Sequence, residues 1–245
     1  MYKNINDDYI LTYKALLLYN KLSKETKMQK KKIYTSIFVV SLILSNICAS
    51  RLIYIGVKLD GIDITLPGGI ILYPITFLCT DVIGEKYGKK ESNECVLAGL
   101  VCQIFVICIS KIFLWLPAVD SSVDIAYQTV FAQSIPIMIG SILSYIISQT
   151  WDVYVFHKIR NYFISRDMRF RKHRWIWNNA STLSSQLFDT IVFSVISFGI
   201  GLGWLFDPIM RYQLFGLCLG QYVCKIILAL LDTPLFYLFT RERYG

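Results

Sequence analysis

Long apolar runs alternate with short charged segments along most of the chain. After residue 32, six apolar stretches follow one another, each close to the ~20 residues that a helix needs to cross ~30 Å of hydrocarbon. The second stretch follows Pro67, begins with Gly68 and Gly69 and is interrupted by Pro74. This pattern is typical of a short or broken helix. The pattern predicts an all-α membrane protein with six transmembrane helices, expected at residues 33–56, 68–84, 94–116, 134–157, 183–204 and 212–239.

The composition supports this interpretation. Of the 245 residues, 55% are hydrophobic and only 17% are charged, whereas soluble domains carry about 25% charged residues. So little charge could not cover the surface of a soluble domain, and so apolar a chain does not stay disordered in water. A soluble globule and a disordered chain are both excluded, and the predicted surroundings are a lipid bilayer.

Basic residues alternate between the two ends of the predicted helices. One set of ends holds 20 Lys and Arg residues, in residues 1–32, 85–93 and 158–182 and in the C-terminus. The opposite set, the loops at 57–67, 117–133 and 205–211, holds 2. By the positive-inside rule, both termini are cytoplasmic. The predicted division is a lysine-rich tail at 1–32, a transmembrane domain at 33–240 and a cytoplasmic C-terminus at 241–245. The tail is interpreted as solvated, with a short amphipathic surface helix as the alternative.

The net charge of +8 follows from this placement, so nucleic acid is not an expected partner. The seven cysteines form no CxxC pair and lie in or beside apolar runs, which favours small buried side chains over metal ligands or disulfides. The two histidines form no HxxxH or HExxH pair, and neither a GxSxG motif nor a phosphate-binding glycine loop is present. We therefore expect neither a metal nor another cofactor, and no enzymatic activity.

Several charged and amide side chains lie within the predicted membrane helices. A charge at the centre of such a helix costs about 2.5–3.5 kcal/mol on insertion scales, so these residues usually face partners or a water-filled cavity. Arg51 and Lys111 lie near helix ends, where their side chains reach the membrane surface. The deeper residues are interpreted as a binding site, with interhelical bonds that hold the bundle together as the alternative. They are Asn46, Gln149, Asp152, Gln186, Asp189, Gln221, Lys225 and Asp232.

One polar pattern occurs twice. Residues 148–152 read Ser-Gln-Thr-Trp-Asp and residues 185–189 read Ser-Gln-Leu-Phe-Asp, and a Phe follows each Asp after four positions. The predicted helices that carry the two copies run in opposite directions, which is typical of an inverted repeat with a site between its halves. Carboxylates and carboxamides beside aromatic faces would suit a small planar heterocycle rich in N–H and C=O groups.

These stretches resemble the queuosine precursor transporter family, also described as a vitamin-uptake transporter family. The resemblance covers residues 35–240, which include all six predicted helices. One position departs from the family: Trp177 stands where many members have Arg before an Asn-Asn pair, and Arg174 lies three residues earlier. The matching stretches are Ser45-Asn46, Tyr73–Asp81 with Glu85–Gly88, Ser148–His157, Asn178–Thr182, Ser185–Phe193, Lys225 and Thr233–Tyr237.

The resemblance implies import of a 7-deazaguanine-type queuosine precursor, such as preQ0, preQ1 or queuine, across the bacterial cytoplasmic membrane. It also implies a six-helix fold similar to the substrate-binding subunits of energy-coupling-factor vitamin transporters. The expected partners are a small planar heterocycle and the bilayer, and formation of a homodimer is left open. The predicted substrate-binding residues are Asn46, Phe77, Asp81, Gln149, Asp152, Asn179, Gln186, Asp189 and Lys225.

In this hypothesis the carboxylates of Asp152 and Asp189 accept hydrogen bonds from N–H groups of the substrate. Gln149 and Gln186 bind its carbonyl and the adjacent N–H, and Lys225 balances the carboxylates.

Two further aspartates have separate expected roles: Asp81, which closes the second helix, is a candidate gate residue, and Asp232 is a candidate partner of the buried lysine. The alternative function is a substrate-binding subunit for another vitamin-like molecule that works with a separate energising module. An AxxxA motif, which such subunits carry on the helix facing the partner, does not occur in the sequence. Proton coupling and facilitated diffusion both remain open.

Overall fold

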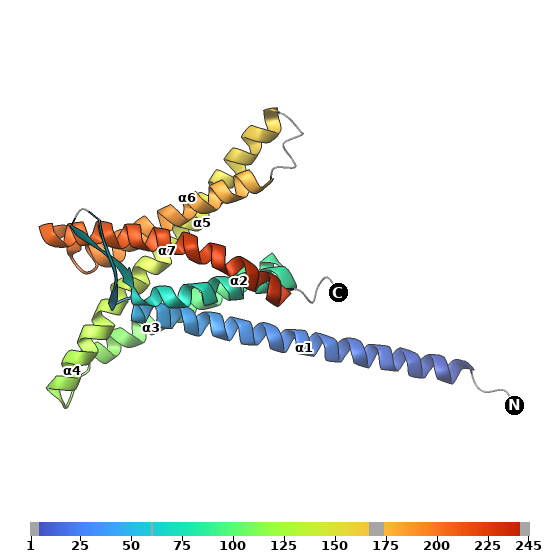
Figure 1. Ribbon diagram of the computed structural model, residues 1–245. Helices are drawn as coiled ribbons and strands as arrows, with labels where there is room; N and C mark the ends of the chain where they lie inside the picture. The colour runs from blue at the N-terminus through green and yellow to red at the C-terminus, as the bar shows by residue number, and fades with distance from the viewer. Residues whose placement is uncertain (1–4, 60, 167–173, 241–245) are drawn as a thin grey trace.

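A computed structural model describes the backbone of residues 5–59, 61–166 and 174–240, and most side chains between residues 27 and 228 (Figure 1). The chain forms a bundle of long helices, interrupted by one β-hairpin and by short 3-10 and π-helical turns. The elements are α1 (Ile5–Cys48), β1 (Leu52–Leu59), β2 (Ile62–Pro67), η1 (Gly68–Leu72), α2 (Tyr73–Tyr87), α3 (Lys89–Trp115), α4 (Ser121–Tyr127), η2 (Gln128–Ala132), α5 (Gln133–Arg166), α6 (Arg174–Ser194), η4 (Val195–Ile200), η5 (Trp204–Phe206) and α7 (Pro208–Thr240).

Several of these helices suit a membrane. Within the described part of the chain, five segments are long and apolar enough to cross one, and they correspond to the first five predicted spans. Helix α7, with 33 residues, covers the sixth. The five segments are Lys27–Cys48, Gly68–Tyr87, Lys89–Trp115, Ser121–Asp152 and Leu183–Ile200.

The prediction of an all-α fold was wrong in one region. The first predicted helix, expected to reach residue 56, ends at Cys48, and residues 52–67 form an antiparallel hairpin in which Leu52 faces Pro67 and Leu59 faces Ile62. Strand β1 is rich in β-branched and aromatic residues, which favour extended backbone. Gly56 and Gly61 adopt positive φ angles of 79° and 81°, which only glycine adopts readily.

An ion pair joins the two strands of this hairpin next to its turn. Lys58 Nζ lies 3.2 Å from Asp63 Oδ1 across the two strands, and the hydrogen bond that the ammonium donates to this carboxylate raises the pKa of Lys58. Both side chains are exposed enough for solvent to screen the pair, so it contributes little stability. Its effect is to favour one pairing register of the strands next to the turn.

The second predicted helix is broken, as expected. A 3-10 turn over Gly68–Leu72 precedes α2, and Pro74 lies in the first turn of that helix, where its missing N–H leaves no bond unmade. The predicted tail differs more, because α1 is helical from Ile5 and continues without a break into the first span. Figure 1 shows this helix extending well beyond the rest of the bundle. Whether residues 1–32 lie in solvent or on a membrane stays a prediction.

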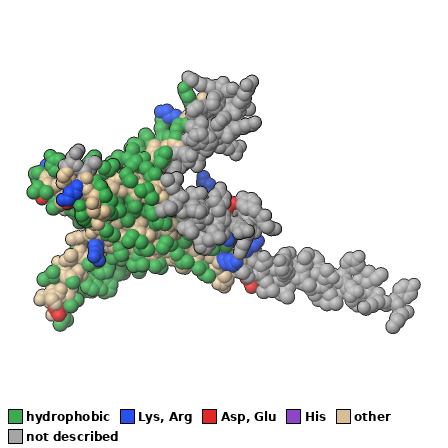
Figure 2. Space-filling model, in the orientation of Figure 1, with side chains coloured by type: hydrophobic (Ala, Val, Ile, Leu, Met, Phe, Trp, Pro, Cys, Tyr) green, Lys and Arg blue, Asp and Glu red, His purple; other side chains and the backbone are tan. Residues whose placement is uncertain are grey.

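The bundle has an inverted distribution of polarity. Large apolar side chains such as Phe105 and Phe113 point outward, with 65% and 61% of their surface exposed, whereas Gln103, Gln221 and Lys225 are buried. Figure 2 shows hydrophobic side chains covering most of the visible face of the described bundle. This arrangement is expected of a protein whose outer surface meets lipid and whose interior carries the polar groups.

Glycines allow the irregular segment 49–72 to pack tightly. A Cβ at Gly69 would lie 1.9 Å from the Ser45 carbonyl oxygen, so only glycine brings η1 this close to the end of α1. Gly216 and Gly220, one turn apart on α7, similarly receive the backbone of β2 at Asp63 and Thr65. The hairpin and the 3-10 turn are therefore held between α1 and α7.

We expect Gly69→Ala to lower the free energy of unfolding by about 1–3 kcal/mol, because the new methyl group displaces backbone rather than a flexible side chain. Gly84→Ala is the matched control, since its Cβ would meet nothing closer than Ser92 Cβ at 3.7 Å. Thermal unfolding of the purified variants in detergent measures the difference. Equal melting temperatures for the two variants would contradict the close packing of η1 on α1.

Candidate functional site

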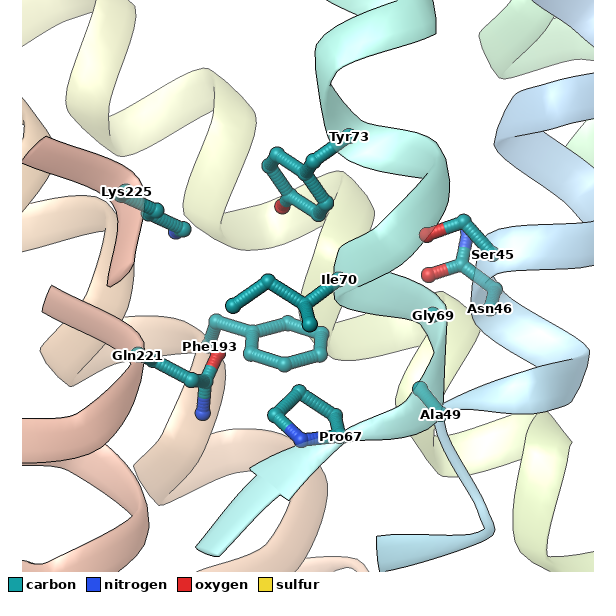
Figure 3. A pocket seen from close by; sticks show the side chains of 10 residues that line it. All are labelled: Ser45, Asn46, Ala49, Pro67, Gly69, Ile70, Tyr73, Phe193, Gln221 and Lys225. Carbon is teal, nitrogen blue, oxygen red and sulfur yellow. The ribbon is translucent and has the colours of Figure 1, made fainter. Parts of the chain in front are cut away.

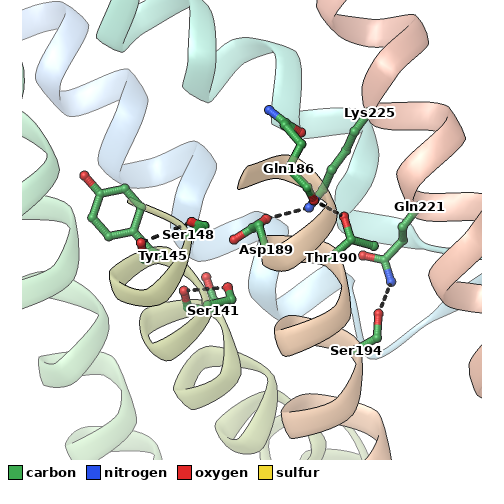
Figure 4. Close-up of polar contacts among 10 residues, drawn as sticks. Ser141, Tyr145, Ser148, Gln186, Asp189, Thr190, Ser194, Gln221 and Lys225 are labelled. Carbon is green, nitrogen blue, oxygen red and sulfur yellow. Dashed lines mark hydrogen bonds and ion pairs between the residues drawn. The ribbon is translucent and has the colours of Figure 1, made fainter. Parts of the chain in front are cut away.

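A buried ion pair joins α6 and α7 in the interior of the bundle. Lys225 on α7 is only 4% exposed, and its Nζ lies 2.6 Å from Oδ2 of Asp189 on α6. The same ammonium lies 5.0 Å from the ring centroid of Tyr73, the first residue of α2, where the ring face attracts a cation. One charge thus links three helices, and its contact with Asp189 is drawn in Figure 4. The pair satisfies the requirement that a buried charge has a partner.

The ammonium of Lys225 borders a small pocket (Figure 3). Residues from α1, the end of β2, η1, α2, α6 and α7 meet there. The cavity has a volume of about 10 Å³, which has room for only about one water molecule. The walls must therefore separate before a larger molecule enters. The lining residues are Ser45, Asn46, Ala49, Pro67, Gly69, Ile70, Tyr73, Phe193, Gln221 and Lys225.

Two amides in this pocket have their nitrogens bound to protein. Asn46 Nδ2 donates to the Leu42 carbonyl at 3.1 Å, and Gln221 Nε2 donates to Ser194 Oγ at 3.1 Å. Each amide oxygen is then left as an acceptor. Figure 3 shows the side-chain oxygen of Asn46 directed from α1 toward the pocket. Tyr73 and Phe193 add aromatic surface to the same walls.

The two copies of the repeated motif pack against each other across α5 and α6. Ser185 Oγ donates to Asp152 Oδ1 at 3.1 Å. Trp151 Nε1 donates to Ser184 Oγ at 3.3 Å, and the Trp151 and Phe188 rings lie 4.3 Å apart. In an antiparallel pair with this register, Ser148 stands opposite Asp189. Ser148 instead donates to the Tyr145 carbonyl within its own helix, at 3.1 Å.

The structure brings some of the predicted site residues together. Asn46 and Lys225 line the pocket, and Asp189, which is not part of the lining, is paired with the lysine. Asp152 is half-buried and bound to Ser185, so the two aspartates have separate partners. Neither aspartate lines the pocket described above, whereas the hypothesis placed both against the substrate.

Other predicted residues lie farther out. Gln149 is exposed on α5, and Gln186 is half-buried on α6 outside the pocket lining. Phe77 is 40% exposed, and its ring lies 5.5 Å from that of Tyr73. Asp81 is exposed on α2 and makes polar interactions there.

The remaining predictions concern side chains that the structure does not describe. Asn179, together with Trp177 and Arg174 beside it, belongs to the first part of α6, and Asp232 belongs to the last part of α7. Substrate binding by Asn179, the replacement of the family's Arg by Arg174 and the pairing of Asp232 with Lys225 stay predictions.

Four polar or aromatic side chains of the pocket were not among the predicted substrate-binding residues, although Gln221 was one of the deep polar residues interpreted as a binding site. Ser45 and Tyr73 occur in the stretches that resemble the family, yet neither was assigned a role. Gln221 and Phe193 are buried and line the pocket. A usable signal was the spacing of Gln221 and Lys225, because residues four apart share one face of a helix. Among the described residues, no three His, Cys, Asp or Glu side chains are grouped as metal ligands.

Residues 67–239 match the family described as "Putative vitamin uptake transporter". The chain belongs to this family. The matched region includes η1, α2, α6 and α7, and thus the Lys225–Asp189 pair, while Ser45 and Asn46 on α1 lie before it. Membership confirms the prediction of a transport protein rather than an enzyme.

Two named relatives are similar over most of their length. The chain is 31% identical over 194 residues to the "Probable queuosine precursor transporter" of Bacillus subtilis (strain 168), covering 79% of each protein. It is 22% identical over 207 residues to the "Queuosine precursor transporter" of Escherichia coli (strain K12), covering 84% of each. These relatives confirm the resemblance described above. No solved structure matches the chain.

Removing one partner of the buried pair should destabilise the protein more than removing both. We expect Lys225→Met to lower the free energy of unfolding by about 3 kcal/mol, because Asp189 then keeps an unpaired charge. The double variant Lys225→Met/Asp189→Asn should recover most of this loss. Chemical denaturation in detergent measures all three proteins.

Lys111→Met is the matched control for this measurement. Lys111 is exposed on α3, so its replacement should change the free energy of unfolding by no more than about 0.5 kcal/mol. A double variant as unstable as Lys225→Met alone would show that the pair is not what holds α6 to α7.

Proposed function

We propose that this chain imports a queuosine precursor of the 7-deazaguanine type across the bacterial cytoplasmic membrane, for salvage into tRNA queuosine. Family membership supports a transporter, and the names of the two bacterial relatives support the substrate. The observation that carries the proposal is the buried Lys225–Asp189 pair at the wall of a pocket with aromatic and amide side chains. Intramembrane charges of this kind commonly mark substrate pathways.

The pocket residues fit the chemistry of a 7-deazaguanine. Such a heterocycle has N–H donors along one edge, a carbonyl acceptor at position 6 and two flat faces. Asn46 and Gln221 offer acceptor oxygens, and the Lys225 ammonium has further N–H groups to donate besides the one that Asp189 accepts. Tyr73 and Phe193 would contact the flat faces. In this proposal Asp189 acts through Lys225, as its counter-ion.

Movement of the pocket walls is the transport step in this proposal. The enclosed space is far smaller than the heterocycle, so the site opens to one side of the membrane, closes around the substrate and opens to the other. The wall formed by Pro67, Gly69 and Ile70 belongs to an irregular segment. That segment can change its backbone angles more readily than the long helices around it.

The finer topology belongs to the same proposal. In this proposal α7 crosses the membrane as the sixth span, and its 33 residues are long enough to do so. The protein then has six transmembrane helices, with both termini in the cytoplasm. The alternation of basic residues supports this orientation in the inner membrane. Similarity to the substrate-binding subunits of energy-coupling-factor transporters, and a homodimer, stay predictions.

Queuosine in tRNA provides the test of function. In a strain that cannot make the precursor and lacks its own importer, we expect expression of this chain to restore queuosine when a 7-deazaguanine is supplied at low concentration. Asn46→Ala should reduce the restored level by about tenfold, because the substrate loses a hydrogen-bond acceptor in a desolvated site. Equal restoration with and without the chain would refute the proposal.

Lys111→Met is again the control, and the amount of each variant in the membrane is measured alongside. The host should also lack energising modules for vitamin transport. Restoration in that host assigns transport to this chain alone. Restoration only when a module is supplied assigns it to the alternative function, a substrate-binding subunit.

A further inference from the structure

The pocket presents one charge, and that charge is positive. Lys225 is the sole charged residue among the described residues that line it. The carboxylate of Asp189 lies 2.6 Å from Nζ and is not part of the lining. The pair as a whole is neutral, but its ammonium borders the pocket and its carboxylate does not.

The other polar groups fix how a heterocycle would lie. The free oxygens of Asn46 and Gln221 attract its N–H edge, since both amide nitrogens already donate to the protein. The ammonium of Lys225 attracts its carbonyl oxygen, as a charged donor to an uncharged acceptor. Gln221 and Lys225 are one turn apart on α7, so an acceptor and a donor from one helix face address two parts of the same small molecule.

The chemistry of the substrate then places its variable group next to the lysine. In a 7-deazaguanine, the substituent at position 7 lies on the same side of the fused rings as the carbonyl at position 6. A carbonyl bound to Lys225 therefore brings the substituent beside the ammonium. An uncharged substituent with an acceptor atom, such as a nitrile, is compatible with this position. A protonated aminomethyl group would place a second cation there without an acid in the lining to balance it.

We infer that the pocket selects 7-deazaguanines with an uncharged substituent at position 7 and disfavours those with a cationic one, and that Lys225 sets this preference. The inference rests on the proposed function and adds the charge class of the substrate. Like charges in a site with little solvent are strongly unfavourable. The expected discrimination is about tenfold or more in affinity.

Competition binding tests the preference. The purified chain in detergent binds labelled 7-cyano-7-deazaguanine, and unlabelled 7-cyano-7-deazaguanine or 7-aminomethyl-7-deazaguanine is added as competitor at neutral pH. The aminomethyl compound is a cation there, and we expect it to compete about tenfold less well or worse. Binding needs no energising module, so the result does not depend on how transport is driven.

Charge variants identify the residue responsible. Lys225→Met leaves Asp189 as an unbalanced anion and should move the preference toward the cationic compound. Lys225→Met/Asp189→Asn removes both charges and should give an intermediate preference. A lysine that only stabilised the fold would lower the binding of both compounds and leave their ratio unchanged, so an unchanged ratio in both variants overturns the role of Lys225.

The outcomes separate this inference from the proposed function. Tighter binding of the cyano compound supports both. Equal or tighter binding of the aminomethyl compound overturns the charge preference and leaves the proposed function standing. If neither compound binds and tRNA queuosine does not depend on the chain, the proposed function fails and the inference with it.

Discussion

A lysine ammonium in the interior of a membrane protein is shielded from bulk water, so its position fixes what must surround it. Lys225 therefore holds Asp189 of α6 at 2.6 Å and the Tyr73 ring of α2 at 5.0 Å. If either helix rotated or slid, the charge would lose its partner at a cost of several kcal/mol. This requirement brings the start of α2, the last third of α6 and the middle of α7 to one place. The pocket lies at this meeting point, lined by residues of all three helices.

The β-hairpin meets a second constraint of the bilayer. An open strand edge leaves N–H and C=O groups unpaired, and hydrocarbon does not tolerate them. Strand β2 is protected because it pairs with β1 and lies against Gly216 and Gly220 on α7, where no side chains keep the two backbones apart. In a bilayer the other edge of β1 would need contact with water. The hairpin lies along the first half of α7 and ends at Pro67, in the wall of the pocket.

Most helices could be predicted because lipid imposes a length and a composition that one sequence displays directly. The hairpin could not, since residues 52–57 continue the apolar run of the first span, and such a run is compatible with helix or strand. The contacts within the site could likewise be predicted only in part. Burial of Asn46, Asp189 and Lys225 follows from their depth, but partner choice depends on how each helix is rotated. On α5 the inward residues are Ser144, Ser148 and Asp152, and Gln149, one position away from that stripe, turns outward.

The two copies of the repeated motif make different contacts in the structure. In the α5 copy, Asp152 accepts a hydrogen bond from Ser185 and ties α5 to α6. The corresponding bond from Ser148 to Asp189 is not made, because Ser148 bonds within its own helix and Asp189 turns to Lys225. One aspartate thus joins the two repeated segments, and the other joins them to α7. Trp151 stacked on Phe188 reinforces the first junction, whereas the pocket adjoins the second. If the walls separate during transport, α5 and α6 are therefore expected to move as one unit, and the irregular wall of Pro67, Gly69 and Ile70 is where the pocket can open without breaking the Lys225–Asp189 pair.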